Sequence, residues 1–226
     1  MLNSISENLK QIYHNIEEAR VRSNRENDII KLMAVTKTVD ADRINFAISQ
    51  GIDLLGENRV QEYIDKRNSY DKSADVHFIG HLQTNKVKYI IDSVKMIHSA
   101  DSLKLAAEIN RQAELHNMTM DVLAEVNIGM EESKNGLMPD EVIDFAYRIS
   151  ELQNLRLRGL MTIPPPYDPE RYFEKTYRLY DDLRSEKITN TRIDVLSMGM
   201  SSDYTKAIKY GSNIIRIGSG IFGARK

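Results

Sequence analysis

The sequence predicts an α/β fold, and within that class a closed (β/α)8 TIM barrel with an extra N-terminal helix. Short β-rich runs alternate with segments of helical pattern, and eight such runs can be counted. Several runs are almost continuously apolar, as expected for parallel strands buried on both faces. The length of 226 residues is within the range of this barrel, near its small end. An open, doubly wound sheet is the competing arrangement, and the strand count favours the barrel.

The first element is an amphipathic helix that we place within residues 1–28. Ser4 and Glu7 form a capping-box pattern at its start. Apolar residues then recur at helical spacing, at Ile5, Leu9, Ile12, Ile16 and Ala19. Polar and charged residues fill the opposite face. We therefore expect this helix to pack against one side of the barrel.

The predicted strands follow one another at short intervals along the rest of the chain. They are expected at Leu32–Thr36, Ile52–Leu55, Val76–Ile79, Met96–His98, Val122–Ile128, Leu155–Ile163, Ile193–Leu196 and Asn213–Ile217. Helical patterns between them cover 82–93 and 102–116, and a further helix is expected to begin near Pro139. No linker or change of composition divides the chain. The prediction is one domain over residues 1–226.

Composition excludes several classes of protein. The 31 Lys and Arg residues nearly balance 33 Asp and Glu residues, which argues against nucleic acid or an anionic membrane as partner. There is no cysteine, so disulfides, thiolate metal sites and cysteine nucleophiles are excluded. No His or carboxylate cluster predicts a metal site. Glu7 and Lys10 interrupt any apolar stretch of a secretory signal, so we expect a cytoplasmic protein.

A lysine follows the first predicted strand. In a (β/α)8 barrel the functional face is built from residues just beyond the carboxyl ends of the strands. Lys37, in the segment AVTKTV, occupies such a position. Burial in the barrel mouth favours the neutral amine, which can form a Schiff base. The alternative is a rim lysine whose amine reaches water.

The last two strands end in small-residue loops, SMGMSSD and RIGSGIFG. The first loop contains Ser201 and Ser202, and the second contains Gly218 and Ser219. Loops after the seventh and eighth strands form the usual phosphate site of this barrel, although each alone is also explained as a tight turn. The second loop matches the G-x-G-x-x-G dinucleotide pattern as well. We reject that match because the sequence stops at Lys226, before the rest of a βαβ unit.

Four further residues fall at the ends of strands or inside them. Arg216 interrupts an apolar strand, and an interior arginine needs a partner. That partner is either an acid in a structural salt bridge or a ligand bound between Lys37 and the two small-residue loops. Asn58, His81 and Met161 follow or end other strands. None of the three alone distinguishes a binding or catalytic residue from one that caps a helix or bonds a loop carbonyl.

Together these groups describe a site for pyridoxal 5'-phosphate (PLP). The segments AVTKTV, LLGENRVQE, HFIGHLQTNK, GLMTI, SMGMSSDY and RIGSGIFGAR resemble successive signatures of the PLP homeostasis proteins, the YggS/PROSC type. They run from Ala34 to Arg225 in the family's order. That family resembles the N-terminal barrel of alanine racemase and of fold type III decarboxylases, without their second β-domain.

The resemblance implies a role in PLP binding for particular residues of this chain. They are Lys37 as the Schiff-base lysine, Ser201, Gly218 and Ser219 at the phosphate, Arg216 at the pyridine nitrogen, and Asn58 and Met161 around the ring. The family more often has Thr in place of Ser219, and Ser keeps the hydroxyl. It more often has Ala in place of Gly220.

The function implied is PLP binding in PLP homeostasis, without catalytic residues or established turnover. A cation at the pyridine nitrogen disfavours its protonation and weakens the cofactor as an electron sink. Apo PLP-dependent enzymes are the expected partners, and a monomer is expected because racemase-type dimers use the absent domain. One alternative is a slow racemase-like enzyme in which His81 or a water supplies the second proton. Another is an aldolase-type barrel in which Lys37 forms the Schiff base with a sugar phosphate. If the protein binds PLP, Lys134, in the loop after the fifth strand, is a candidate for a second PLP site.

Overall fold

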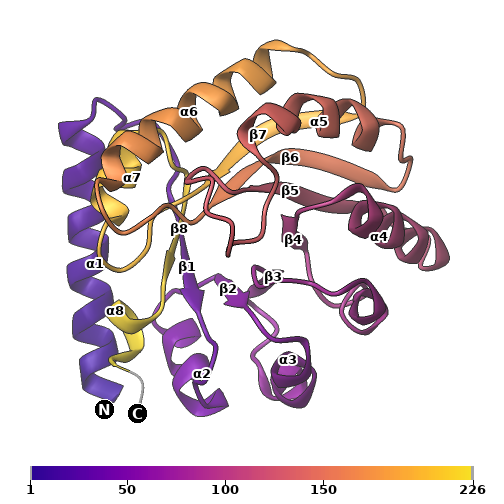
Figure 1. The fold of residues 1–226 in the computed structure, drawn as a ribbon. Coiled ribbons are helices and arrows are strands. Elements are labelled where there is room, and N and C mark those ends of the chain that lie inside the picture. The colour runs from indigo at the N-terminus through magenta and orange to yellow at the C-terminus, as the bar shows by residue number, and fades with distance from the viewer. Residues whose placement is uncertain (1, 225–226) are drawn as a thin grey trace.

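The computed structural model describes residues 2–224 and shows eight parallel strands closed into a barrel in chain order (Figure 1). The strands are β1 (Lys31–Val35), β2 (Leu54–Glu57), β3 (Asp75–Phe78), β4 (Met96–Ala100), β5 (Met120–Val126), β6 (Leu155–Thr162), β7 (Thr191–Ser197) and β8 (Ile214–Ile217). Pairing of β8 with β1 closes the ring. The (β/α)8 prediction is confirmed and the open sheet is wrong.

Helices surround the barrel on its outer side (Figure 1). They are α1 (Leu2–Arg22), α2 (Ala41–Ser49), α3 (Val60–Lys66), α4 (Leu103–Leu115), α5 (Val142–Ser150), α6 (Pro169–Ser185), α7 (Tyr204–Lys209) and α8 (Ser219–Phe222). Ser102 caps α4 by accepting a hydrogen bond from the amide of Leu105, at 3.3 Å. Pro139 begins a short 3₁₀ turn that leads directly into α5.

The N-terminal helix ends earlier than the segment 1–28 in which we placed it. α1 stops at Arg22, and turns follow over residues 23–28. Its predicted apolar face is buried throughout. The helix lies along α7 and α8 (Figure 1), and Asn8 donates a hydrogen bond of 3.0 Å to the carbonyl of Ile221 in α8. α1 therefore covers the side of the barrel that carries α7 and α8.

The helix expected over 82–93 is wrong. The structure has a 3₁₀ helix at Thr84–Tyr89 between β3 and β4. Val87 and Ile90 are nonetheless fully buried, and the amide of Ile90 bonds the carbonyl of Val87 at 3.1 Å. A 3₁₀ turn also places residues three apart on one face, so the apolar spacing did not distinguish it from an α-helix.

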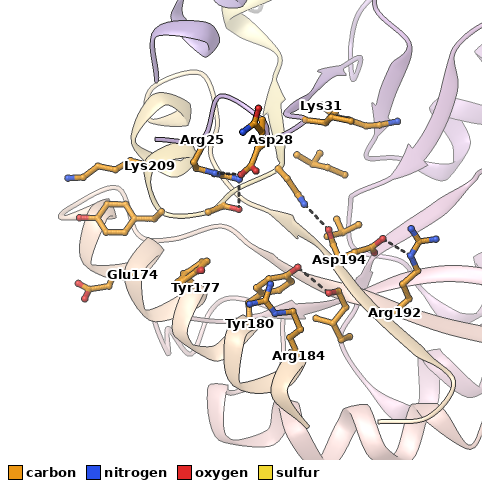
Figure 2. A pocket seen from close by; sticks show the side chains of 18 residues that line it. Arg25, Asp28, Lys31, Glu174, Tyr177, Tyr180, Arg184, Arg192, Asp194 and Lys209 are labelled. Atoms are coloured by element: carbon orange, nitrogen blue, oxygen red, sulfur yellow. Dashed lines mark hydrogen bonds and ion pairs between the residues drawn. The ribbon is translucent and has the colours of Figure 1, made fainter. Parts of the chain in front are cut away.

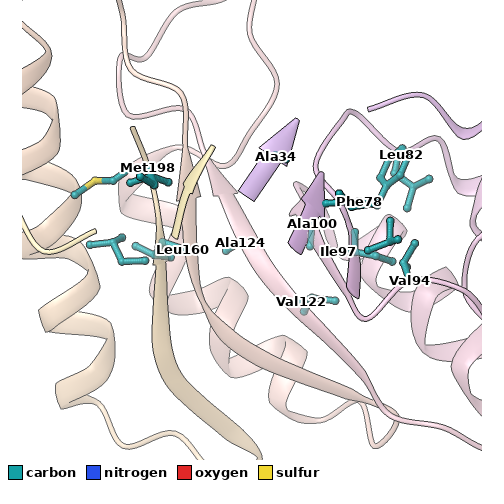
Figure 3. Close-up of a cluster of buried hydrophobic side chains, with 14 of the residues drawn as sticks. Ala34, Phe78, Leu82, Val94, Ile97, Ala100, Val122, Ala124, Leu160 and Met198 are labelled. Carbon is teal, nitrogen blue, oxygen red and sulfur yellow. The ribbon is translucent and has the colours of Figure 1, made fainter. Parts of the chain in front are cut away.

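Two apolar clusters hold the barrel together. The smaller fills its interior with side chains from different strands: Met33, Leu54, Ile79, Met96, Leu123, Met161, Val195 and Ile214. The larger lies between the strands and the surrounding helices, and Figure 3 shows part of it, including Ile97 and Leu160. Each fully buried large apolar side chain contributes about 1.5–3 kcal/mol. The strands are thus held on both faces, as their apolar sequences predict.

The main-chain pairing between β7 and β8 is short, and the side chain of Asn213 adds hydrogen bonds to β7. Their register gives a single pair, Ser197 with Ile214. Asn213 accepts a hydrogen bond from the amide of Leu196 at 2.8 Å and donates one to the carbonyl of Asp194 at 2.7 Å. This side chain replaces part of the missing ladder. The amide of Arg216 in β8 also bonds the carbonyl of Gly199, at 3.0 Å, which links β8 to the segment that follows β7.

Candidate functional site

A cleft of about 620 Å³ lies at the carboxyl ends of β8 and β1. Lys37, just beyond β1, and Gly218 and Ser219, just beyond β8, line it together. The remaining lining residues are Ser4, Val35, Thr38, Val39, Asp40, Arg43, Phe222, Gly223 and Ala224. The structure thus brings the candidate Schiff-base lysine and the second small-residue loop into one cavity. Arg225, the last residue of that loop's motif, lies outside the described residues.

The loop after β7 meets the loop after β8 through serine hydroxyls. Ser201 Oγ accepts a hydrogen bond from the amide of Gly220 at 3.2 Å and one from Ser219 Oγ at 3.3 Å. Gly199 has a φ of +91°, and a side chain there would overlap α7. Ser202 is exposed. Of the two serines in the first loop, only Ser201 therefore joins the site.

Arg216 is buried inside the barrel and bonds two neutral acceptors. Its Nη1 donates to the hydroxyl of Ser197 and its Nη2 to the carbonyl of Thr162, both at 2.8 Å. Burial lowers the pKa of Arg216 to about 10, and the negative charge of Glu125 opposes this. The guanidinium stays protonated at neutral pH. Its hydrogen bonds differ from the structural salt bridge that we considered, since both acceptors are uncharged.

Glu125 is a polar residue of the barrel interior that our sequence analysis missed. It lies on β5 two positions after Leu123, a member of the interior cluster, and so faces the same side. Its Oε2 is buried without a hydrogen-bond partner. Burial and the charge of Asp101 raise the pKa of Glu125 to about 7, against the opposing effect of Arg216. The signal was an acid in the apolar run VLAEV, comparable to the arginine in IIRI.

Asn58 and Met161 lie inside the barrel mouth but do not line the cleft. Asn58 Oδ1 is buried and has no hydrogen-bond partner. The main chain of Gly80 packs so closely on Asn58 that any side chain at Gly80 would overlap it. Met161 is fully buried in the interior cluster and pairs in register with Glu125. The unpartnered oxygens of Asn58 and Glu125 indicate that a polar ligand belongs in this mouth.

Two other candidates from the sequence, His81 and Lys134, lie elsewhere, as does Tyr204 at the start of α7. The Nδ1 of His81 is 3.3 Å from a carboxylate oxygen of Asp101, and the His81 side chain is 50% exposed. The hydroxyl of Tyr204 accepts a hydrogen bond of 2.8 Å from Asn15 of α1. Lys134 pairs with Glu131 at 2.7 Å, in the loop after β5. None of the three lines the cleft that contains Lys37.

A larger cleft, of about 1220 Å³, opens near the amino ends of β7, β8 and β1 (Figure 2). Several cations line it, and acids pair with some of them: Arg192 with Asp194 at 2.8 Å, and Arg25 with Asp28. It contains neither small-residue loop. Among residues 2–224 no cluster of acids and histidines could hold a metal ion. Over the same residues, no helix is long and apolar enough to cross a membrane.

The barrel, with a lysine after β1 and small-residue loops after β7 and β8, defines a protein of the alanine racemase N-terminal domain class. The family with that description matches residues 8–226. The pyridoxal phosphate homeostasis protein of Aquifex aeolicus (strain VF5) is 42% identical over 225 residues, which cover 97% of this chain and 98% of the relative. The chain belongs to the pyridoxal phosphate homeostasis protein family.

Solved structures agree with this assignment. An unknown protein from Bifidobacterium adolescentis has a TM-score of 0.93 and 34% identity, covering 98% of this chain and 95% of the other. PipY of Synechococcus elongatus PCC7942, solved with PLP bound, has a TM-score of 0.84 and 28% identity, covering 97% and 100%. An alanine racemase of Clostridium difficile 630 shares the fold, at a TM-score of 0.72 and 19% identity. This chain covers 56% of that racemase.

Proposed function

We propose that this protein binds PLP covalently through Lys37 and acts in PLP homeostasis. The observation that carries the proposal is the cleft shared by Lys37, Gly218 and Ser219, with Ser201 bonded to its edge. The name of the Aquifex aeolicus relative and the PLP-bound structure of PipY support it.

The chemical groups of the site fit PLP. The cofactor carries an aldehyde, a phosphate and a pyridine nitrogen, which call for an amine, an anion site and a ring partner. Lys37 supplies the amine, and the Ser201 and Ser219 hydroxyls with the Gly218 main chain supply polar groups for the phosphate. Arg216 supplies a buried cation. The unpartnered oxygens in the mouth, described above, fit a polar ligand as well.

Each residue then has a defined task. Lys37 would hold PLP covalently through its side-chain amine. Arg216, held by Ser197 and Thr162, would be the cation at the pyridine nitrogen and would disfavour a proton there. Asn58 and Met161 surround the ring. Bound PLP supplies an electron sink for chemistry at an amino-acid α-carbon, and Arg216 weakens that sink.

We infer that the protein holds and delivers PLP and is not an enzyme. A racemase-like reaction needs a second acid or base on the far face of the ring. Tyr204 is bonded to α1, and His81 is half exposed beside Asp101, so neither is placed for that task. The names of the relatives mention no reaction. We propose a monomer that passes PLP to apo PLP-dependent enzymes.

The visible absorption spectrum of the PLP-loaded protein tests the proposal. We expect wild type to show a band from covalently held PLP and Lys37→Ala to lack it. Lys104→Ala, which removes an exposed lysine of α4, is the matched control and should keep the band. A colourless wild type would favour the aldolase-type alternative. A band retained in Lys37→Ala would contradict the assignment of Lys37, and Lys37-dependent racemisation of an amino acid would contradict the carrier function.

A further inference from the structure

Lys37 is presented by a tight turn of residues 36–39, which we call the Lys37 turn. The amide of Val39 bonds the carbonyl of Thr36 across it, at 3.1 Å. Thr38 has a φ of +63°, a left-handed conformation that β-branched residues rarely adopt. Such a backbone persists only where neighbouring groups hold it. The position of Lys37 therefore depends on whatever holds this turn.

Two side chains of α3 hold the main chain of the Lys37 turn. Glu62 Oε1 accepts a hydrogen bond from the amide of Thr38, the strained residue. Lys66 Nζ donates to the carbonyls of Thr36 and Val39, each at 3.1 Å. It also pairs with Glu62 at 2.7 Å, one helical turn away on α3. The two side chains thus bind both ends of the turn and its centre.

Glu57, at the end of β2, connects this arrangement to the barrel wall. Its side chain is fully buried, and its Oε1 accepts hydrogen bonds from Thr36 Oγ1 at 2.6 Å and from the hydroxyl of Tyr70. Lys66 Nζ lies 4.0 Å from the same oxygen. The side chain and the carbonyl of Thr36 are therefore both fixed, and α3, β2 and the Lys37 turn form one bonded unit.

We propose that Glu62 and Lys66 are positioning residues for the attachment of PLP to Lys37. They hold the Lys37 turn in its left-handed backbone and so keep the amine in the cleft with Gly218 and Ser219. This inference rests on the proposed function. Neither Glu62 nor Lys66 lines the cleft, so both act through the main chain of the turn. Their removal should slow attachment without removing the attaching group.

The rate at which the visible band grows after cofactor-free protein is mixed with PLP measures attachment. We expect Glu62→Ala and Lys66→Met to slow it by about tenfold or more, because small displacements of a reacting group have large effects on rate. Glu62→Gln should slow it less than Glu62→Ala, since its amide oxygen can still accept from the Thr38 amide. This rescue distinguishes positioning from a general loss of packing.

Two further variants separate position from stability. Arg158→Met removes a guanidinium that bonds Asp121 and Asp194 at the opposite end of the barrel, so it should lower thermal stability without slowing attachment. Thr38→Gly, added to Glu62→Ala, should restore part of the lost rate. Glycine adopts a positive φ without strain and needs less support from Glu62.

The outcomes distinguish the two proposals. If wild type shows no band that depends on Lys37, the proposed function fails and this inference fails with it. If wild type shows the band but Glu62→Ala and Lys66→Met attach PLP at its rate, the inference alone is overturned. Equal slowing by Arg158→Met overturns it as well. Circular dichroism checks that each variant folds. If Lys66→Met does not fold, Lys66→Gln replaces it. Its amide keeps a donor group for the turn's carbonyls, and the variant should still slow attachment.

Discussion

Arg216 and Thr162 are joined across the inside of the barrel by a hydrogen bond of 2.8 Å from the guanidinium of β8 to the carbonyl of β6. The hydroxyl of Ser197 on β7 accepts a second bond of the same length. One side chain therefore connects three strands. Because both acceptors are neutral, the guanidinium keeps its orientation without an ion pair that would cancel its charge.

Replacing this arginine should destabilise the barrel. Arg216→Met leaves the Thr162 carbonyl and the Ser197 hydroxyl buried without their donor, and each such group costs about 1–3 kcal/mol. Removal of a desolvated charge offsets part of this loss. We expect the free energy of unfolding to fall by about 2–4 kcal/mol in urea titrations. Arg192→Met, which removes an exposed ion pair, should change it by about 1 kcal/mol or less. Equal losses of unfolding free energy in Arg216→Met and Arg192→Met would contradict a stabilising role for the buried hydrogen bonds of Arg216.

The two serines of the loop after β7 should differ in their effect on PLP binding. Ser201→Ala removes a hydroxyl that bonds Ser219 and the Gly220 amide beside the cleft, so we expect PLP to bind about tenfold more weakly. Ser202→Ala changes an exposed neighbour and should bind PLP as wild type does. Fluorescence titration with PLP measures both. A larger loss in Ser202→Ala would reverse our assignment of the phosphate contact.

Most of the fold and the position of the site could be predicted from the apolar strand patterns and from the residues at the strand ends. Each apolar run became a strand, and Lys37 and the small-residue loops could be placed because parallel strands bring their carboxyl ends to one face. The segment 82–93 was misassigned because its apolar spacing suits a 3₁₀ turn as well as an α-helix. Local patterns decide faces and strand ends, but not the type of a short helical turn.

The remaining features depend on tertiary contacts that no local pattern contains. One acceptor for Arg216 is a main-chain carbonyl, that of Thr162, and carbonyls are the same at every residue. The bonds from Glu62 and Lys66 to the Lys37 turn exist only once α3 has docked beside β1. Glu125, by contrast, could have been found by the argument applied to Arg216, since both are charged residues in apolar strands.

The raised pKa of Glu125 predicts a pH-dependent stability. The pKa is about 7 in the folded protein and near 4.5 in the unfolded chain, so the folded state binds more protons between these values. Stability contributed by this group is therefore present below about pH 4.5 and is lost as pH rises through 7. The loss is about 3.5 kcal/mol at most, taking 1.4 kcal/mol per unit of pKa.

Glu125→Gln removes this titration and tests the prediction. In the cofactor-free protein we expect the variant to gain stability relative to wild type as pH rises from 5 to 8, because Gln stays neutral. Urea unfolding at several pH values measures the difference. Glu114→Gln, which changes an exposed residue of α4, is the control and should follow the wild-type curve. A constant difference between Glu125→Gln and wild type would show that Glu125 does not titrate in this range.

The buried histidine pair should make the protein sensitive to acid. His77 Nδ1 lies 2.9 Å from His98 Nε2 inside the barrel. Burial lowers the pKa of His77 to about 3, and burial with the nearby charges of His77 and Arg216 lowers the pKa of His98 well below its usual value. Below about pH 6.5 the two histidines therefore bind protons in the unfolded chain but not in the folded state. The free energy of unfolding consequently falls as pH falls.

The slope of that loss gives the test. Each histidine contributes up to about 1.4 kcal/mol per pH unit between its unfolded and folded pKa values. Glu57 and Glu125, whose pKa values are raised, act in the opposite direction, so only a comparison with a variant isolates the histidines. We expect His77→Gln to lose less stability than wild type between pH 6.5 and 4.5 in urea titrations. Parallel curves would mean that His77 is protonated in the folded barrel, and that its bond to His98 does not require two neutral rings.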